Sequence, residues 1–281
     1  MKINATTKLC LIIGDPVEDS LSPQIHNAGY EQLGLEAAFV YAACRIKSEE
    51  LAAFVGGAKA MAIRGFGCKM PHKLEIMRYL DEIDPIARQI GAVNTVVNDN
   101  GKLKGYNTDH IGIIAPLEAV TGLKGKKVAL LGAGGAARAA AYGLTSRGAE
   151  LTIYNRTLEK AEQLAGRFGA TARSFDALQE VKAAAIIVNT TSVGLPLAAN
   201  ETPLPQELIS KDQIVFDAVY AQGETRLSRE AREQGATVIL GTEMLLYQGL
   251  AQFKLFTGHE APEDAMRKAL LVAMNDEGNE S

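Results

Sequence analysis

The chain has 281 residues, of which 47% are hydrophobic and 22% charged, and its formal net charge is −4 at pH 7. This mildly acidic balance, with unclustered lysine and arginine, excludes a nucleic-acid surface, and no apolar run is long enough to span a membrane. The three cysteines and four histidines lack the spacing of a metal site, so we expect a cytoplasmic, metal-free protein of two domains.

The N-terminal part alternates strands and helices. Strands are predicted at 9–13, 39–43 and 61–64, and helices at 23–33, from 48 onward and at 71–80. Such alternation predicts a mainly parallel sheet with helices on both faces. Ser22 followed by Pro23 is typical of a helix N-cap and first helical residue. Further on, two runs on either side of the Asn100-Gly101 turn predict a β-hairpin.

A glycine-rich turn between two strands is the most informative stretch of the sequence. The strand at 128–131 is followed by Gly132, Gly134 and Ala137, then by an alanine-rich helix and a second strand at 151–154. This order is typical of a dinucleotide-binding fold. Gly132 permits the tight turn, Gly134 lets the backbone approach a pyrophosphate, and Ala137 allows the helix to pack closely on the strand. The free N–H groups at the helix start favour the phosphates.

The residues after the second strand favour NADP over NAD. An NAD site usually has a carboxylate near this position to hold the ribose 2′-hydroxyl, whereas this chain has Asn155, Arg156 and Thr157, with Lys160 one helical turn further on. Arg156 can pair with a 2′-phosphate and lay its guanidinium plane against the adenine. The alternative is that Thr157 caps the next helix and the two cations are solvated. NAD is the alternative cofactor.

The rest of the chain continues the alternation. An amphipathic stretch at 110–119 predicts a helix between the two domains. Beyond the glycine turn, strands are predicted at 184–189, 214–219 and 237–240, and helices at 243–256 and 262–274. The predicted fold class is therefore α/β with two domains, an N-terminal α/β substrate domain and a doubly wound, Rossmann-type NADP-binding domain.

Short motifs follow one another along almost the whole chain. They are Ser20-Leu-Ser22-Pro23 with His26-Asn27, Pro71-His-Lys73, Ala92-Val-Asn94-Thr95, Gly105-Tyr-Asn107-Thr108-Asp109, Gly132-Ala-Gly-Gly-Ala-Ala-Arg138, Asn155-Arg-Thr157, Asn189-Thr-Thr-Ser-Val-Gly194, Asp217-Ala-Val-Tyr220, Glu224-Thr225 and Met244-Leu-Leu-Tyr-Gln248-Gly249. In this order they resemble the shikimate dehydrogenase family, which includes quinate/shikimate and aminoshikimate dehydrogenases. The resemblance implies a substrate-binding and catalytic domain at 1–109, completed by helices within 244–281, and an NADP-binding domain at 110–243.

The resemblance also implies roles for individual residues. Lys73 and Asp109 are the implied catalytic pair, because the reduction of a ketone by hydride requires a proton for the developing alkoxide. An ordinary structural ion pair is the alternative for these two residues. The implied substrate contacts are Ser20, Ser22, Lys69, Asn94, Tyr220 and Gln248. The implied cofactor contacts are Gly132, Ala133, Gly134, Gly135, Ala136, Asn155, Arg156, Thr157, Lys160, Thr190, Ser192, Val219, Gly241 and Met244.

The chain departs from the family pattern around Lys69. The family usually has Asn-Val-Thr where this chain has Gly67-Cys68-Lys69, and His where it has Asp19; Arg226 replaces a common Pro. In one interpretation Lys69 turns outward or pairs with Asp19 and the pocket is unchanged. In the other, the pocket accepts a smaller or differently charged acid. Cys68 is expected to be a structural thiol, because no histidine–acid arrangement accompanies it.

We therefore expect an NADP-dependent oxidoreductase that interconverts 3-dehydroshikimate and shikimate, with Lys73 and Asp109 transferring the proton. The alternative is a related enzyme that acts on quinate or another hydroxy acid because of Lys69, or that uses NAD. A third hypothesis is a non-catalytic dinucleotide sensor, although a sensor has no need of a proton donor. The expected partner is a small hydroxy-acid substrate, with no nucleic acid and no membrane, and the chain is expected to be a monomer or a homodimer.

Overall fold

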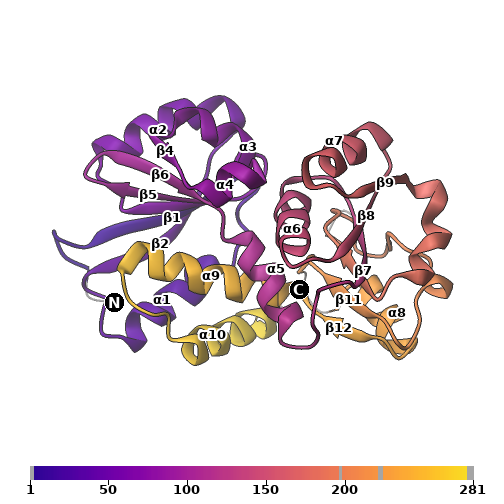
Figure 1. The fold of residues 1–281 in the computed structure, drawn as a ribbon. Helices are drawn as coiled ribbons and strands as arrows, with labels where there is room; N and C mark the ends of the chain where they lie inside the picture. Colours follow the sequence, from indigo (N-terminus) through magenta and orange to yellow (C-terminus); the bar gives the residue numbers. More distant parts are fainter. Residues whose placement is uncertain (1–2, 196–197, 221–223, 277–281) are drawn as a thin grey trace. The chain divides into compact units, whose positions relative to one another are not determined.

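The computed structural model describes residues 3–195, 198–220 and 224–276 (Figure 1). The chain divides into two compact units. The first contains the described residues up to Thr108 and from Gln248 onward, and the second contains Asp109–Tyr247. Both units are sheets covered by helices, so the predicted α/β class with two domains is confirmed.

The first unit is built on a mixed six-stranded sheet. Its strands, in the order β2-β1-β3-β5-β6-β4, are β2 (Phe39–Arg45), β1 (Lys8–Gly14), β3 (Gly65–Cys68), β5 (Thr95–Asp99), β6 (Lys102–Tyr106) and β4 (Glu82–Ile83). The pairs β1–β2, β1–β3 and β4–β6 are parallel, whereas β3–β5 and β5–β6 are antiparallel. The predicted hairpin is therefore confirmed. Its turn places Asn100 at φ 55° and Gly101 at φ 87°, as a type I′ turn requires.

Helices from both ends of the chain cover this sheet. They are α1 (Ser22–Gln32), α2 (Leu51–Ala60), α3 (His72–Glu75), α4 (Pro85–Ile90), the second half of α9 (Gly241–Thr257) and α10 (Glu263–Asp276), with 3₁₀ turns at Ser48–Glu50 and Ile76–Tyr79. Figure 1 shows the yellow α9 and α10 beside α1. A Cβ atom on Gly29 of α1 would lie 2.8 Å from Phe253 and 3.1 Å from Met266. Glycine therefore lets the three helices pack closely.

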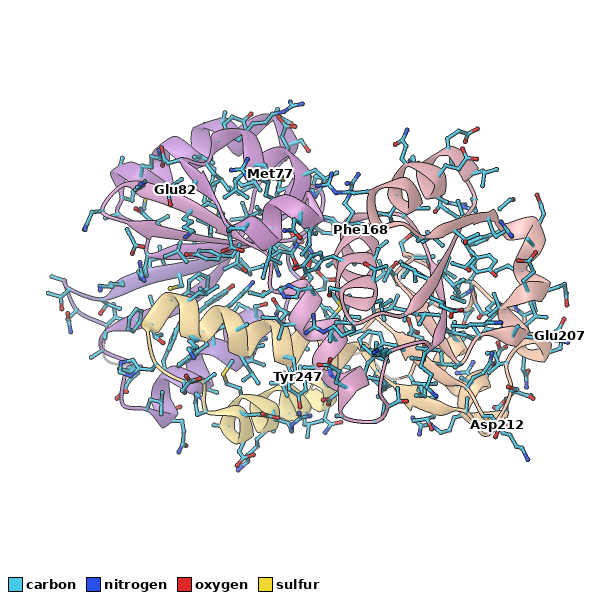
Figure 2. All side chains as sticks on the ribbon, viewed as in Figure 1. Met77, Glu82, Phe168, Glu207, Asp212 and Tyr247 are labelled. Atoms are coloured by element: carbon cyan, nitrogen blue, oxygen red, sulfur yellow. The ribbon has the colours of Figure 1, made fainter. Side chains whose placement is uncertain are left out.

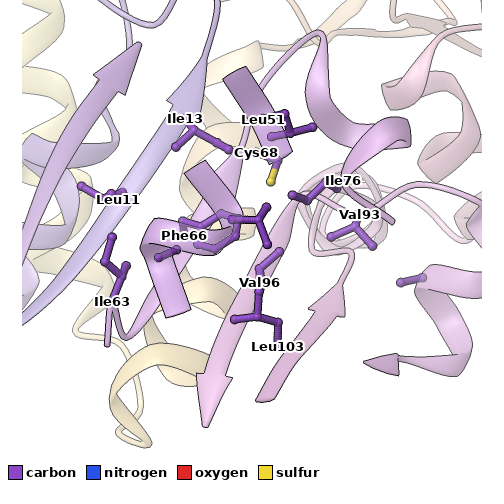
Figure 3. Close-up of a cluster of buried hydrophobic side chains, with 13 residues drawn as sticks. Leu11, Ile13, Leu51, Ile63, Phe66, Cys68, Ile76, Val93, Val96 and Leu103 are labelled. Carbon is purple, nitrogen blue, oxygen red and sulfur yellow. The ribbon is translucent and has the colours of Figure 1, made fainter. Parts of the chain in front are cut away.

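A cluster of buried hydrophobic side chains lies on one face of this sheet, beside a strand that was predicted wrongly. Figure 3 shows Phe66 at the centre of the cluster, with Ile63 and Cys68 near it. The predicted strand at 61–64 is wrong, because α2 is followed by a turn in which Ala62 has φ 51°, and β3 begins only at Gly65. Cys68 is buried in this cluster, as expected for a structural thiol.

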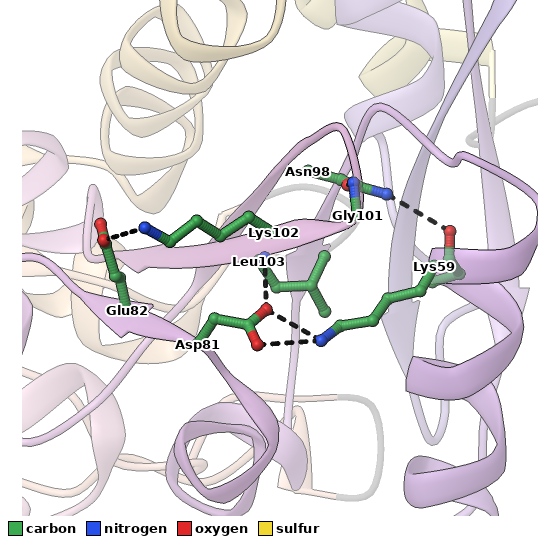
Figure 4. A network of polar contacts seen from close by, with 8 residues as sticks. Lys59, Asp81, Glu82, Asn98, Gly101, Lys102 and Leu103 are labelled. Carbon is green, nitrogen blue, oxygen red and sulfur yellow. Dashed lines mark hydrogen bonds and ion pairs between the residues drawn. The ribbon is translucent and has the colours of Figure 1, made fainter.

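Polar contacts hold the β5–β6 hairpin to its neighbours. Figure 4 shows Lys59 of α2 reaching Asp81, with Nζ 2.8 Å from Oδ2, and the same carboxylate accepting a hydrogen bond from the Leu103 amide at 2.7 Å. Lys102 pairs with Glu82 at 2.5 Å. The hairpin starts directly after Asn94 and ends just before Asn107.

A histidine is fully buried among aromatic rings in the first unit. The His26 ring stacks on Tyr41 with centroids 4.3 Å apart, and Phe253 lies 6.2 Å away. Both ring nitrogens are buried, and Gln252 of α9 is the polar side chain that acts on the ring. Burial lowers the pKa of His26 from its ordinary 6.5 to about 3, and the Gln252 amide opposes this only in part. The imidazole is therefore neutral in the folded protein.

Acid should weaken the fold through His26. Because the pKa is about 3 in the folded state and 6.5 in the unfolded state, the unfolded chain binds an extra proton between these values, and stability falls as the pH drops below 6.5. The free energy of unfolding should fall by about 2 kcal/mol between pH 6.5 and pH 5 from this group. The free energy of unfolding of His26→Phe, measured with urea, should depend less on pH than that of the wild type. Parallel curves for wild type and His26→Phe would contradict this assignment.

The second unit is a doubly wound parallel sheet. Its strands, in the order β12-β11-β10-β7-β8-β9, are β12 (Thr237–Ile239), β11 (Ile214–Asp217), β10 (Ile186–Asn189), β7 (Lys127–Leu131), β8 (Glu150–Asn155) and β9 (Thr171–Ser174). The helices are α5 (Asp109–Glu118), α6 (Gly135–Ser146), α7 (Leu158–Phe168), α8 (Arg226–Glu233) and the start of α9, with 3₁₀ segments at Phe175–Ala183 and Gln206–Leu208. All five strand pairings are parallel. The order changes direction at β7, so the carboxyl end of β7 is the expected cofactor position.

Close helix packing positions the glycine turn. A Cβ atom on Gly143 of α6 would lie 2.5 Å from Ile114 of α5, so α5 and α6 approach closely. Tyr142 of α6 packs edge-on against His110 of α5 and against Phe168, which Figure 2 labels at the end of α7. None of the described helices combines the length and hydropathy needed to cross a membrane.

Candidate active site

Two serine hydroxyls lie together at the carboxyl edge of the first sheet. β1 and β3 are parallel neighbours, and the Lys69 amide donates to the Ile13 carbonyl at 2.7 Å, so the loops that follow these strands are adjacent. Ser20 and Ser22 are only 7% and 3% exposed, and their hydroxyl oxygens are 3.2 Å apart. The predicted N-cap role of Ser22 is wrong. Leu21 occupies the N-cap position without a side-chain bond, and Ser22 begins α1.

The Lys69 side chain is held by an ion pair with Asp19. Its ammonium group forms an ion pair and a hydrogen bond with Asp19, and its side chain is 23% exposed. A Cβ atom on Gly14 would lie 2.9 Å from the Cβ of Lys69, so the lysine stem crosses the end of β1 directly over this glycine. Of the two interpretations of Lys69, pairing with Asp19 is therefore the one that the structure contains.

The backbone around Lys73 is fixed next to Asn94. Lys73 is the second residue of the short helix α3, which begins at His72 with Pro71 as its N-cap. Its carbonyl oxygen accepts a hydrogen bond from the Val93 amide at 2.8 Å. Because Val93 precedes Asn94, this bond brings the backbone of the two predicted site residues together. The Lys73 side chain is half-buried.

Asn94 is the centre of a buried hydrogen-bond network. Its Oδ1 accepts from the Thr108 amide at 2.7 Å and from the Thr95 hydroxyl at 2.8 Å, and its Nδ2 donates to the Thr108 hydroxyl at 2.9 Å. Gln252 of α9 donates from Nε2 to the Thr95 hydroxyl at 2.9 Å. The sequence prediction missed Thr95, Thr108 and Gln252. The spacing of Gln252 four residues after Gln248, one helical turn, could have signalled it.

The predicted site residues are divided between the two units. Ser20, Ser22, Lys69, Lys73, Asn94 and the buried Gln248 belong to the first unit. Asp109, which is buried at the start of α5, and the half-buried Tyr220 belong to the second. The approach of Asp109 to Lys73 stays a prediction.

The glycine turn after β7 has the shape that a dinucleotide requires. Gly132 has φ +104°, and a Cβ atom there would lie 3.0 Å from the Thr190 hydroxyl, so only glycine fits. A Cβ atom on Gly134 would meet nothing within 4 Å, and Gly134 is exposed. Ala137 is fully buried against the sheet. The half-exposed backbone of Ala133, Gly135 and Ala136 completes a loop at the start of α6, where the first N–H groups have no partner within the helix.

The tip of β8 carries the residues predicted to select NADP. The side-chain Nδ2 of Asn155 donates to the Thr157 carbonyl at 2.8 Å, which closes the turn. Thr157 is the N-cap residue of α7 without a side-chain capping bond. Arg156 and Lys160 are both exposed at this end of the sheet. The residues therefore fit a 2′-phosphate, since two cations and a helix start share one edge.

The other side of the glycine turn is formed by β10, β11 and α9. Thr190 follows β10, and its hydroxyl donates to the Leu131 carbonyl at 2.8 Å, while Ser192 is exposed two residues further on. A Cβ atom on Gly241 would lie 2.6 Å from the carbonyl oxygen of Val219. Met244 is buried in the first turn of α9. In the described residues, no group of histidine, cysteine and acidic side chains is arranged to hold a metal ion.

Three protein-family models match consecutive parts of this chain. They are the shikimate dehydrogenase substrate binding domain at residues 12–96, the shikimate/quinate 5-dehydrogenase model at 116–218 and the shikimate 5′-dehydrogenase C-terminal domain at 241–271. A shikimate dehydrogenase (NADP⁺) of Moorella thermoacetica is 44% identical over 98% of this chain and 96% of its own length. The chain belongs to the shikimate dehydrogenase family. It is therefore an oxidoreductase of the class that acts on a CH–OH group.

Solved structures of this family share the fold over nearly the full length. A crystal structure of a shikimate dehydrogenase in complex with NADP⁺ has a TM-score of 0.91 and 41% identity, with 97% of each chain covered. The ligand-free 5-ketofructose reductase of a Gluconobacter strain has a TM-score of 0.84 and 34% identity, covering 96% of this chain and 100% of its own. The fold of this family therefore also occurs in an enzyme named for another ketone substrate.

Proposed function

We propose that this protein interconverts 3-dehydroshikimate and shikimate with NADP(H). The observation that carries the proposal is the ion pair between Lys69 and Asp19, because it ties down the residue whose sequence position argued against the family substrate. The serine pair, the backbone of Lys73 and the buried Asn94 network lie in the unit matched by the substrate-binding model. The sequence similarity to NADP-dependent shikimate dehydrogenases supports the same conclusion.

Each residue has a chemical task in this proposal. NADPH, when bound, supplies the hydride to the carbonyl carbon. Lys73 donates a proton from Nζ to the developing alkoxide oxygen, and in the reverse direction it accepts the proton of the alcohol. Asp109 orients the Lys73 ammonium group and balances its charge. The Ser20 hydroxyl donates to Ser22 Oγ at 3.2 Å, which leaves the Ser22 hydroxyl as a donor to an acid oxygen of the substrate.

The cofactor is held at three places in this proposal. The backbone from Gly132 to Ala136 binds the pyrophosphate at the start of α6. Arg156 and Lys160, with Asn155 and Thr157 shaping the turn, bind the 2′-phosphate. The residues proposed for the nicotinamide side are Thr190, Ser192, Val219, Gly241 and Met244.

A second candidate substrate is another hydroxy acid or a neutral polyhydroxy ketone. Lys69 replaces a short hydroxyl side chain with a long cation, and its side chain remains 23% exposed beside the loop that carries Ser20. The 34% identity to a 5-ketofructose reductase shows that proteins this similar carry different substrate names. Tyr220 and Gln248 are proposed substrate contacts in both cases.

Steady-state oxidation of shikimate and quinate, each with NADP and with NAD, tests the proposal. Shikimate with NADP should be the best pair, and Lys69→Thr should change its kcat/KM by less than about three-fold, because the Lys69 ammonium group pairs with Asp19 and does not bind the substrate in this proposal. Reduction of 5-ketofructose serves as the comparison for the second candidate. A wild type inactive on both acids, together with a Lys69→Thr variant that gains shikimate turnover, would show instead that Lys69 has changed the pocket.

A further inference from the structure

A buried carboxylate lies at the carboxyl end of β11. Asp217 is 0% exposed, and burial raises the pKa of its carboxyl group. Its Oδ1 accepts from Asn189 Nδ2 at 2.8 Å and from the Val219 amide at 3.2 Å. Its Oδ2 accepts from the Thr225 hydroxyl at 2.5 Å and from the Ser228 hydroxyl at 3.4 Å. Among the described residues all four donors are neutral, so hydrogen bonds and the start of α8 stabilise the charged form.

Asn189 extends this arrangement to the neighbouring strand. It is in register with Asp217 in the β10–β11 pair, and it is also fully buried. Its Oδ1 accepts from the Thr191 amide at 3.0 Å and from the Thr191 hydroxyl at 2.8 Å. Thr190, which lies between Asn189 and Thr191, donates from its backbone amide and its hydroxyl to the Leu131 carbonyl at 2.9 and 2.8 Å. A continuous set of contacts therefore joins the ends of β7, β10 and β11.

The strand order indicates which half of the cofactor lies next to these hydrogen-bonded strand ends. β8, which Arg156 directly follows, lies on one side of β7, whereas β10 and β11 lie on the other. A dinucleotide that places its pyrophosphate at the β7 turn and its 2′-phosphate at Arg156 must extend its nicotinamide half toward β10 and β11. The loops that Asp217 and Asn189 hold are therefore the loops on the nicotinamide side.

We propose that Asp217 and Asn189 are positioning residues that hold residues 190–192, after β10, and residues 218–220, after β11, in the arrangement that receives the nicotinamide half of NADP. This inference rests on the proposed cofactor site. A buried charge with neutral partners is a poor source of stability, because an apolar pair of similar size would avoid the desolvation cost. What the pair supplies is a fixed geometry, in which one carboxylate sets the directions of both loops.

The affinities for two ligands distinguish this positioning role from a purely structural role of Asp217 and Asn189. NADPH contains both halves of the dinucleotide, whereas 2′,5′-ADP contains only the half that Arg156 binds. In Asp217→Ala, the Kd of NADPH measured by calorimetry should rise roughly ten-fold or more, because the loops lose four hydrogen bonds to a charged group. The Kd of 2′,5′-ADP should change by less than about two-fold, since the β8 tip is untouched. Asn189→Ala should show the same selectivity.

A matched control lies at the opposite end of the same strand. Gln213 is buried just before β11, donates from Nε2 to the carbonyls of Val181 and Ala184 at 3.0 and 2.9 Å, and accepts from the Ser210 amide at 2.8 Å. Gln213→Ala therefore loses a comparable set of buried bonds at the edge away from the glycine turn. Its melting temperature should fall, as in Asp217→Ala, while its Kd for NADPH should match the wild type.

The binding results for these variants can be told apart from a failure of the proposed shikimate oxidation. If Asp217→Ala does not fold, Asp217→Asn keeps an acceptor oxygen for Asn189 and should show a smaller loss for NADPH with the same selectivity. Equal loss for both ligands, or NADPH binding unchanged in a folded variant, would overturn the inference. A wild type that binds both ligands but does not oxidise shikimate would reject the substrate proposal and leave this inference standing.

Discussion

In the Lys73→Ala variant, kcat for shikimate oxidation with NADP should fall by roughly 10³-fold, within the range usual for the loss of a general acid or base. The Kd of NADPH should stay within about two-fold of the wild type, because the cofactor residues proposed here are all in the other unit. The substitution leaves the local backbone intact, since the bond from the Val93 amide goes to the Lys73 carbonyl rather than to its side chain. Stopped-flow and steady-state absorbance of the reduced cofactor measure the loss.

Lys59→Ala is the control for this prediction. Lys59 is a lysine of the same unit, on α2, and its ion pair with Asp81 lies in the hairpin network rather than at the predicted site (Figure 4). It should retain near-normal turnover. A Lys73→Ala enzyme with more than about a tenth of the wild-type kcat would contradict the proton-transfer role. Wild-type protein that binds NADPH but turns over no hydroxy acid would favour the sensor hypothesis.

Arg156→Ala should discriminate sharply between the two reduced cofactors. The KM for NADPH should rise roughly 10- to 150-fold, which corresponds to the 1.5–3 kcal/mol typical of a hydrogen bond to a charged group. The KM for NADH should change by less than about two-fold, because NADH has no 2′-phosphate for the guanidinium group to bind. The measurement is the ratio of the two KM values in the variant and in the wild type. The change should shrink at high salt, since Arg156 is exposed.

Arg173→Ala provides the matched arginine for this test. Arg173 lies on β9, beside β8, and pairs with Glu180 at 3.1 Å. Its removal lowers the positive charge of the same unit by the same amount without changing the β8 tip. Both KM values should remain near those of the wild type. Equal effects of Arg156→Ala on NADPH and NADH would be evidence against this 2′-phosphate site.

Elements with a strong local signal could be predicted from the sequence. The stretch from β7 to β8 was predicted within one or two residues, because its strands are apolar runs and its turn requires a glycine with positive φ at Gly132. The predictions failed where the signal is short or mixed. Residues 61–64, three of which are apolar, belong to a turn and the entry into β3 rather than to a strand. The short elements β4, α4, β9 and α8 were not predicted.

The candidate site shows the same division between local and distant information. The sequence identified Ser20, Lys73 and Asn94 by their motifs, and the family assignment that these motifs supported is confirmed. It did not identify Thr95 and Gln252 as partners in the Asn94 network, or Asp217 as a buried junction. Gln252 and Thr95 are 157 positions apart in the chain, so no local pattern links them.

The sequence by itself determined most of the longer strands and helices, the glycine turn and the residues that stand at the strand ends, because these depend on neighbours within a few positions. Only the tertiary structure decided that Lys69 pairs with Asp19, 50 positions away, and that Asn189 and Asp217 face each other across β10 and β11. Those pairings depend on which strands lie side by side and in which register. Strand order and register are fixed by burial of the whole sheet rather than by any short segment.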